Sequence, residues 1–264
     1  MAAGQVSREF DGTDDTISNS TLPDSDVTGA ITLCLWTRIE TGSAFRHFAA
    51  KHAEDGDNKN PFDFRTSNDA APKLTIVRAA SPAFTFHTWN SGTNTLTLGK
   101  WHFVGVTVAD GDIDTQPRFH LDDLNFLATD ETDNGNGTVV GSGADLVLGR
   151  RPDGAVIMDG QMAHFHIYNR VLSGDELNHI KQFPGSITKG LKLYYPLGRG
   201  NAFEPDLSGN GHTGTVNGAT LSPQAPPISG MFKPRRPEWA YTIPADAPEP
   251  AATTVDQSFV FTGW

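Results

Sequence analysis

Three groups of residues in this sequence have side chains that could recognise a sugar. Trp89 is followed by Asn90, so an apolar ring stands next to an amide that both donates and accepts hydrogen bonds. Asp55 and Asp57 stand in an Asp-Gly-Asp-Asn run, and a second acidic run, Asp-Glu-Thr-Asp-Asn-Gly, covers residues 130–135. Ligand sites commonly combine rings with a few polar groups on loops. We therefore predict a carbohydrate site that includes Trp89, Asn90, Asp55 and Asp57, and we interpret both acidic runs as loops.

Metal and nucleophilic chemistry have weaker candidates. His164 and His166 are two residues apart in an alternating run, so they share one strand face and could hold a transition metal. No Cys or Glu accompanies them, which favours ordinary sheet histidines. Cys34, the single cysteine, lies inside an apolar run and is interpreted as a small core residue rather than a nucleophile. The sequence contains no Gly-x-Ser-x-Gly elbow.

The charge balance argues against some classes of partner. Twenty Lys and Arg residues against 31 Asp and Glu give a net charge of −11, whereas nucleic-acid binding needs clustered cations that neutralise phosphates. No apolar run approaches the roughly 18 residues that a membrane span requires. The opening MAAGQVSREFDGTDD has neither the basic nor the apolar region of a secretory signal. We therefore expect no nucleic-acid or membrane partner, in a chain made in the cytosol or one whose signal has been removed.

Short strands would position these groups. Asp outnumbers Glu by 23 to 8, and Asp favours turns whereas Glu favours helices. In the run 162–168, Ala163, Phe165 and Ile167 are predicted to share one face, with His164 and His166 on the other. Runs with strand patterning recur about every ten to twenty residues between Asp, Gly and Asn turns; they cover 31–39, 73–78, 83–89, 101–108, 119–121, 146–148, 162–168 and 191–196. This spacing predicts a two-sheet antiparallel sandwich.

One short helix is predicted after Ser173. Ser173 and Glu176 have the spacing of a capping box at the start of GDELNHIK, and Leu172 and Leu177 occupy the positions of a hydrophobic staple. The Phe-Pro-Gly run at 183–185 ends the helix.

The composition changes at residue 223. The last 42 residues hold 8 of the 17 prolines, which excludes a regular sheet or helix. Disordered tails are poor in aromatic residues, whereas interfaces are rich in them. We predict a sandwich over residues 1–222 and an extended arm over 223–264 that binds a partner, with wrapping around its own sandwich and disorder as alternatives. The predicted anchors are Phe232, Trp239, Tyr241, Phe259, Phe261 and Trp264.

Several spaced motifs resemble those of concanavalin A-like, laminin G-like domains. In chain order they are FDGTDD from Phe10, ITLCLWT from Ile31, GKWHFVGVT from Gly99, FHLDD from Phe119 and YNRVLS from Tyr168. The similarity covers about residues 8–183. A further segment, 193–220, resembles a piece that often precedes the first motif in this family, and here it should complete the sandwich at its edge. The resemblance implies an all-β jelly roll of two curved antiparallel sheets, in a family whose members commonly bind sugars or mediate adhesion.

The resemblance also bears on calcium and on catalysis. Family members often hold Ca²⁺ where an Asp-x-Ser-Gly-Asn turn meets a strand carboxylate, which makes Asp206 and Asn210 candidate ligands. Ala163 and His164 replace the strand carboxylates, so a capped turn without metal is the favoured interpretation, and no other cofactor is expected. Related glucanases carry a Glu-x-Asp-x-Glu strand, which this sequence lacks.

Two functions remain open at this stage. The first is a non-enzymatic structural protein of a virus particle, a bacteriophage capsid decoration or tail-surface protein that is anchored through its C-terminal arm. Its partners would be other virion proteins and further copies of itself. The second is a bacterial extracellular carbohydrate-binding or adhesion module, for which glycans would be the partners. The looser resemblance of the whole layout, sandwich plus arm, to phage virion proteins favours the first.

Overall fold

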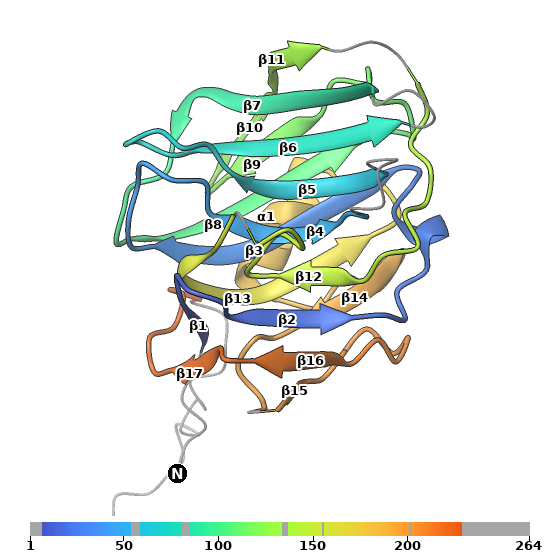
Figure 1. Cartoon of the computed structure of the whole chain (residues 1–264). Coiled ribbons are helices and arrows are strands. Elements are labelled where there is room, and N and C mark those ends of the chain that lie inside the picture. The colour runs from blue at the N-terminus through green and yellow to red at the C-terminus, as the bar shows by residue number, and fades with distance from the viewer. Residues whose placement is uncertain are drawn as a thin grey trace, which may run out of the picture. The chain divides into compact units, whose positions relative to one another are not determined.

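The computed structural model describes residues 7–53, 59–80, 85–133, 137–154, 156–200 and 202–228, with the backbone alone for 130–133. Within these residues the chain forms two antiparallel sheets that face each other (Figure 1). This architecture confirms the predicted jelly-roll sandwich. The chain divides into two units, residues 1–230 and 231–264; the second unit, with all six predicted aromatic anchors, lies outside the described residues.

The first sheet has eight strands. Their order is β10 (Leu124–Leu127), β9 (Arg118–Leu121), β8 (Trp101–Val108), β3 (Ile31–Ile39), β13 (Asp159–Tyr168), β1 (Ser7–Asp11) and β17 (Thr220–Ser222), with β14 (Leu191–Tyr195) also paired to β13.

The second sheet has nine strands. Their order is β11 (Thr129–Asp133), β7 (Thr85–Thr95), β6 (Lys73–Ala80), β5 (Asn60–Thr66), β4 (His47–Lys51), β12 (Leu146–Leu148), β2 (Thr16–Asn19), β16 (Gly214–Asn217) and β15 (Phe203–Glu204). A short 3₁₀ helix, η1 (Asp24–Asp26), follows β2. Strands β15 and β16 belong to the segment 193–220, and β15 is the edge strand of the nine-stranded sheet, which agrees with the predicted place of this segment.

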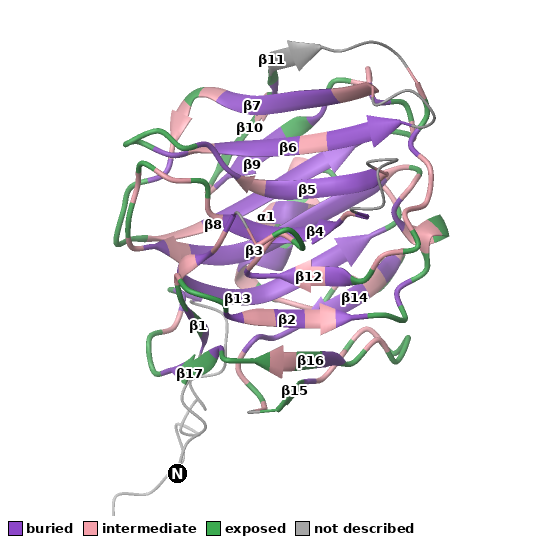
Figure 2. Ribbon diagram, viewed as in Figure 1, coloured by how far each residue is buried: buried purple, intermediate pink, exposed green. Residues whose placement is uncertain are grey.

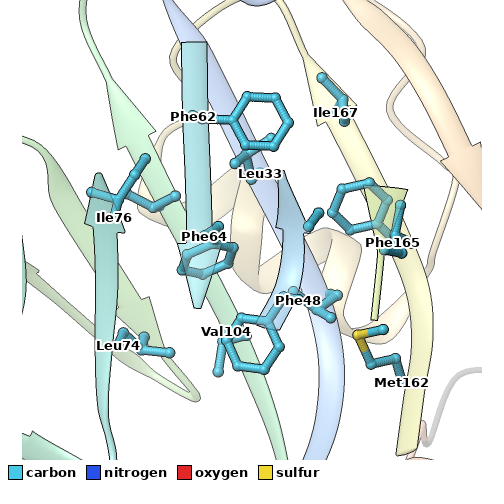
Figure 3. Close-up of a cluster of buried hydrophobic side chains, with 14 of the residues drawn as sticks. Leu33, Phe48, Phe62, Phe64, Leu74, Ile76, Val104, Met162, Phe165 and Ile167 are labelled. Atoms are coloured by element: carbon cyan, nitrogen blue, oxygen red, sulfur yellow. The ribbon is translucent and has the colours of Figure 1, made fainter. Parts of the chain in front are cut away.

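The main core lies between the sheets. Phe48, Phe62 and Phe64 from the nine-stranded sheet pack with Leu33 and Phe165 from the eight-stranded sheet, and all five are fully buried (Figures 2 and 3). Phe48 and Phe64 meet edge to face, with ring centroids 5.1 Å apart. Alternate residues of each strand supply these side chains, because successive side chains of a strand point to opposite faces. The outer faces of the two sheets, which point away from the core, can therefore differ in chemistry.

Helix α1 (Gly174–Gln182) covers part of the outer face of the eight-stranded sheet. Its predicted capping box is present: the Ser173 hydroxyl accepts from the Glu176 amide, and the Glu176 carboxylate accepts from the Ser173 amide. Leu177 and Ile180 pack in a second buried cluster with Cys34 and other residues of the sheet. Cys34 is fully buried, and burial raises the pKa of its thiol. This environment agrees with the predicted core role of Cys34.

Strand β13 does not keep the predicted alternation. Its pairing with β3 shifts register between Ala163 and His166, and His164 has a φ of 53°, in the left-handed region. An extra residue of this kind is a β-bulge, which moves the side chains before it to the other face. Phe165 and Ile167 therefore face the core, whereas Ala163 packs beneath helix α1.

The acidic run at 130–135 is a second correction. Its composition predicts a loop, yet residues 129–133 form β11, which pairs antiparallel with β7. An edge strand is held by backbone hydrogen bonds on one side only, and charged residues are common there. Its polar composition therefore gave no strand pattern.

The first residues of the predicted arm pack on the sandwich. The Ser7 hydroxyl donates to the Gln224 carbonyl at 2.6 Å, and Arg38 donates to the Gln224 side chain at the same distance. Ile228 is buried in the cluster beneath helix α1. Residues 223–228 thus run from β1 across the outer face of the eight-stranded sheet. Among the described residues no helix is long and apolar enough to cross a membrane.

Candidate functional site

The two sheets differ in what lies on their outer faces. Helix α1 packs on the eight-stranded sheet, whereas the loop between β12 and β13 folds back near β4 on the nine-stranded sheet (Figure 1). Within that loop Arg150 bridges to Ile157, and Arg46, next to β4, donates to the Ile157 carbonyl at 3.4 Å. The nine-stranded sheet therefore carries a short loop over part of its outer face, where the eight-stranded sheet carries helix α1.

A row of polar residues crosses the outer face of the nine-stranded sheet. Phe64 faces the core, so the next residue, Arg65, faces outward. The residues opposite Arg65 on the neighbouring strands share that face, because directly paired residues of an antiparallel sheet point the same way. The row consists of Asn90 on β7, Thr75 on β6, Arg65 on β5 and His47 on β4.

The predicted pair Trp89 and Asn90 is split between the two faces of β7. Trp89 is 7% exposed and belongs to the core cluster, so its ring cannot serve as a platform for a sugar. Asn90 lies in the outer row, and its side-chain oxygen accepts from the Gly92 amide at 2.7 Å. Adjacent strand residues point in opposite directions, so only one of the two could line a surface site. Asp55 and Asp57 lie outside the described residues.

A buried ion-pair group holds one end of the outer row. His47 Nε2 lies 3.2 Å from one oxygen of Asp63, and Arg65 donates to the other at 3.0 Å. Both His47 and Asp63 are almost fully buried. Burial pushes the pKa of Asp63 upward, but the hydrogen bond from His47 and the charges of His47, Arg65 and Arg151 outweigh it and lower the pKa. Asp63 is therefore an anion that fixes the positions of Arg65 and His47.

An aromatic ring and a second arginine stand beside this group. The Arg65 guanidinium lies over the Phe45 ring at 4.6 Å, and Phe45 is 36% exposed. The Gly149 amide donates to the Phe48 carbonyl, so the chain leaves β12 beside β4. Arg150 follows Gly149 and is therefore the residue next to His47 in the register. We name Phe45, His47, Asp63, Arg65 and Arg150 the outer-face site. It joins an exposed ring to charged donors, which are the groups a polar ligand needs.

The outer-face site was not predicted from the sequence. Residues 60–66 read Asn-Pro-Phe-Asp-Phe-Arg-Thr, and the alternation of Phe62 and Phe64 with Asp63 and Arg65 is a strand signal. That signal would have placed Asp63 and Arg65 on one face. Phe45 and Arg150 lie outside strands, so only the fold brings them to the same place.

The candidate calcium ligands form a capped turn. Asp206 accepts hydrogen bonds from the amides of Tyr194, Ser208 and His212 at 2.9–3.1 Å, and from the Ser208 hydroxyl at 2.8 Å. Asn210 directs its amide nitrogen to the carbonyls of Leu191 and Lys192. Burial raises the pKa of Asp206 while these hydrogen bonds lower it, and the net shift is downward. Both side chains already have partners within the protein.

His164 and His166 lie near each other on the helix side of β13. His164 Nδ1 is 2.9 Å from the Tyr194 hydroxyl, and His166 stacks on the Tyr194 ring with centroids 4.3 Å apart. His166 also accepts from the Gly185 amide. Burial lowers the pKa of His164 to about 4 and that of His166 to about 3. The two imidazoles are thus neutral packing groups that join β13, β14 and the end of helix α1.

Comparison with solved structures places this fold among known ones. A protein of Bacteroides ovatus that is thought to bind carbohydrate matches with a TM-score of 0.61 and 15% identity, over 86% of this chain and 62% of its own length. A heptameric pentraxin of Limulus polyphemus matches at 0.50 and 15% identity, over 84% of this chain and 96% of its own. The CBM40 of the Ruminococcus gnavus IT-sialidase matches with a TM-score of 0.51 and 12% identity, over 66% of this chain and 95% of its own length.

Comparison of the sequence with known proteins gives the family. No curated protein matches it. A laminin G-like family model matches residues 11–178, which is more than half of the chain and includes the motifs at Gly99 and Tyr168. The chain therefore belongs to the concanavalin A-like lectin/glucanases superfamily.

Proposed function

We propose that this chain is a non-enzymatic carbohydrate-binding module whose ligand lies on the outer face of the nine-stranded sheet. The observation that carries the proposal is the outer-face site, in which the exposed Phe45 ring stands beside Arg65, and Asp63 holds Arg65 in place. Rings with fixed polar neighbours are what sugar recognition requires. The absence of a Glu-x-Asp-x-Glu strand from the sequence supports binding without hydrolysis.

A glycan array with the full chain tests this proposal. We expect binding to a defined set of glycans, and we expect Phe45→Ala to weaken it about tenfold because the stacking surface is lost. Phe183→Ala is the matched control, since Phe183 is also exposed but follows helix α1 on the other sheet. Equal binding by the chain and the Phe45 variant would contradict the site, and release of reducing sugar from a bound glycan would contradict the non-enzymatic role.

We further propose that the module acts at the surface of a virus particle, with residues 229–264 as its attachment to another virion subunit. The support is the sequence of this segment, which is rich in proline and carries six aromatic residues. Extended segments of this composition bind by lying along a partner. A module on a bacterial cell surface is the alternative, and the same carbohydrate site would serve both.

A chain that ends at Ile228 tests the attachment. Residues 223–228 stay in this variant because Ile228 and Gln224 contact the sandwich. We expect light scattering to show assemblies of the full chain and monomers of the short one, with the same midpoint of thermal unfolding. Monomers in both cases, together with failure of the full chain to bind virus particles, would refute the attachment.

A further inference from the structure

Arg150 has an unusual position among the arginines of the outer face. It is partly exposed, its Nε atom is buried, and its side chain has no hydrogen-bond or ion-pair partner among the described residues. Gly154 makes room for its guanidinium: a Cβ on Gly154 would come within 2.3 Å of an Arg150 terminal nitrogen. A guanidinium has five donors in a fixed fork, and it seldom stays without acceptors when its stem is buried.

The neighbouring arginines all have anions of their own. Arg46 lies 3.7 Å from Asp159, Arg65 lies 3.0 Å from Asp63, and Arg151 pairs with Asp153. Each of these three arginines thus has a carboxylate as its partner. Arg150 therefore adds one positive charge that nothing described in the surroundings balances.

A second buried polar side chain lies close to Arg150 in the sheet register. His47 is fully buried, and its Nδ1 atom has no hydrogen-bond partner among the described residues. Gly149 follows β12, and its amide donates to the Phe48 carbonyl. The next residue, Arg150, therefore lies beside His47, and Arg65 lies on the other side of His47. A Cβ on Gly149 would meet the Phe10 ring in the core, so this glycine packs against the inner side of the sheet. The backbone register thus places Arg150 beside His47.

We infer that the outer-face site takes an anionic sugar, with Arg150 as the direct ligand of its carboxylate or sulfate group. The inference rests on the proposed function and gives it a ligand class. A guanidinium binds either acid group through two parallel hydrogen bonds. The sugar ring would then lie toward Phe45, on the other side of Arg65. A chain with a net charge of −11 repels polyanions in general, so binding of an acidic glycan must come from a local site.

Titration calorimetry with three polysaccharides tests the ligand class. Polygalacturonate supplies carboxylates, dextran sulfate supplies sulfates, and dextran is the neutral polymer. We expect the full chain to bind at least one acidic polymer and not dextran, with affinity that falls as salt rises from low to high. Arg150→Gln should weaken that binding about 10- to 100-fold, as expected for loss of a charge-assisted pair. Arg150→Lys keeps the charge but not the fork, and its loss should be smaller.

Arg118→Gln is the matched control. Arg118 is exposed on β9 of the other sheet, where it donates to Asn125, so its loss removes the same charge away from the site. Thermal unfolding of each variant checks the fold. Equal weakening by the Arg118 and Arg150 variants, or unchanged binding by Arg150→Gln, would overturn the inference. Binding to neutral glycans alone would overturn it but leave the proposed function intact, and binding to no glycan would remove both.

Discussion

The buried pair of Arg8 and Glu204 offers the sharpest test of how the C-terminal strands complete the sandwich. The two side chains are fully buried, with 2.7 Å between Arg8 Nη2 and Glu204 Oε2. Arg8 belongs to β1 in one sheet and Glu204 to β15 in the other. The second oxygen of Glu204 accepts from the amides of Leu197 and Gly198, at 2.7 and 3.2 Å. One carboxylate thus joins β1 of one sheet to the edge strand β15 of the other.

Glu204→Gln keeps the shape of the side chain and removes its charge. The Gln oxygen can still accept from both amides, but Arg8 is left as a buried cation without an anion. Breaking a buried pair in this way costs about 3–5 kcal/mol. In a domain of this size about 1 kcal/mol corresponds to 2–4 °C, so the midpoint of thermal unfolding should fall by about 6–20 °C.

A double-mutant cycle separates the interaction free energy of the Arg8–Glu204 pair from the other effects of the two substitutions. Arg8→Met with Glu204→Gln removes both charges, so we expect the double variant to be more stable than Glu204→Gln alone. Urea unfolding at pH 7, followed by tryptophan fluorescence, gives the four free energies. A cost below about 1 kcal/mol for Glu204→Gln, or additive effects of the two changes, would show that the buried pair does not hold β1 to β15.

Two further predictions concern pH and calcium. The pKa values of His164 and His166 in the folded chain, about 4 and 3, lie below the ordinary value of 6.5, so the unfolded chain binds protons first as pH falls. Stability is therefore full above pH 6.5 and should decline below it by about 1.4 kcal/mol per pH unit for each histidine; urea unfolding at pH 7 and 5 measures this, and no change over that range would contradict the buried neutral state. For calcium, Asp206 already accepts four hydrogen bonds from the protein, so we expect millimolar Ca²⁺ to leave the unfolding midpoint unchanged, and a rise that Asp206→Ala removes would show a metal site.

Local rules predicted the parts of this fold that local patterns determine. The apolar run at 101–108 forms β8, and the spacing of Ser173 and Glu176 gives the capping box of helix α1. The capping box depends on contacts within a few residues, and the prediction of β8 depends on burial of both strand faces. The motifs that resemble the superfamily lie in or next to β1, β3, β8, β9 and the end of β13, which is why the fold class could be stated from the sequence.

The errors occurred where pairing rather than side-chain pattern decides the structure. β11 has the composition of a loop and becomes a strand because β7 offers it a free edge. The bulge at His164 changes the faces of β13 without a glycine to mark it. In the outer-face site, Phe45, Asp63 and Arg150 come from three separate parts of the chain. Their proximity depends on the order of β4, β5 and β12, which no local pattern encodes.

The place of β1 in its sheet has a consequence for how the protein is made. Ser7 pairs with Ser222, so the first strand lies between β13 and the last strand of the sheet. A ribosome must therefore release nearly the whole sandwich sequence before this sheet can close. Folding that depends on such distant partners is slow, on the order of milliseconds to seconds for all-β domains. During synthesis β1 therefore stays without its strand partners until β13 and β17 have left the ribosome.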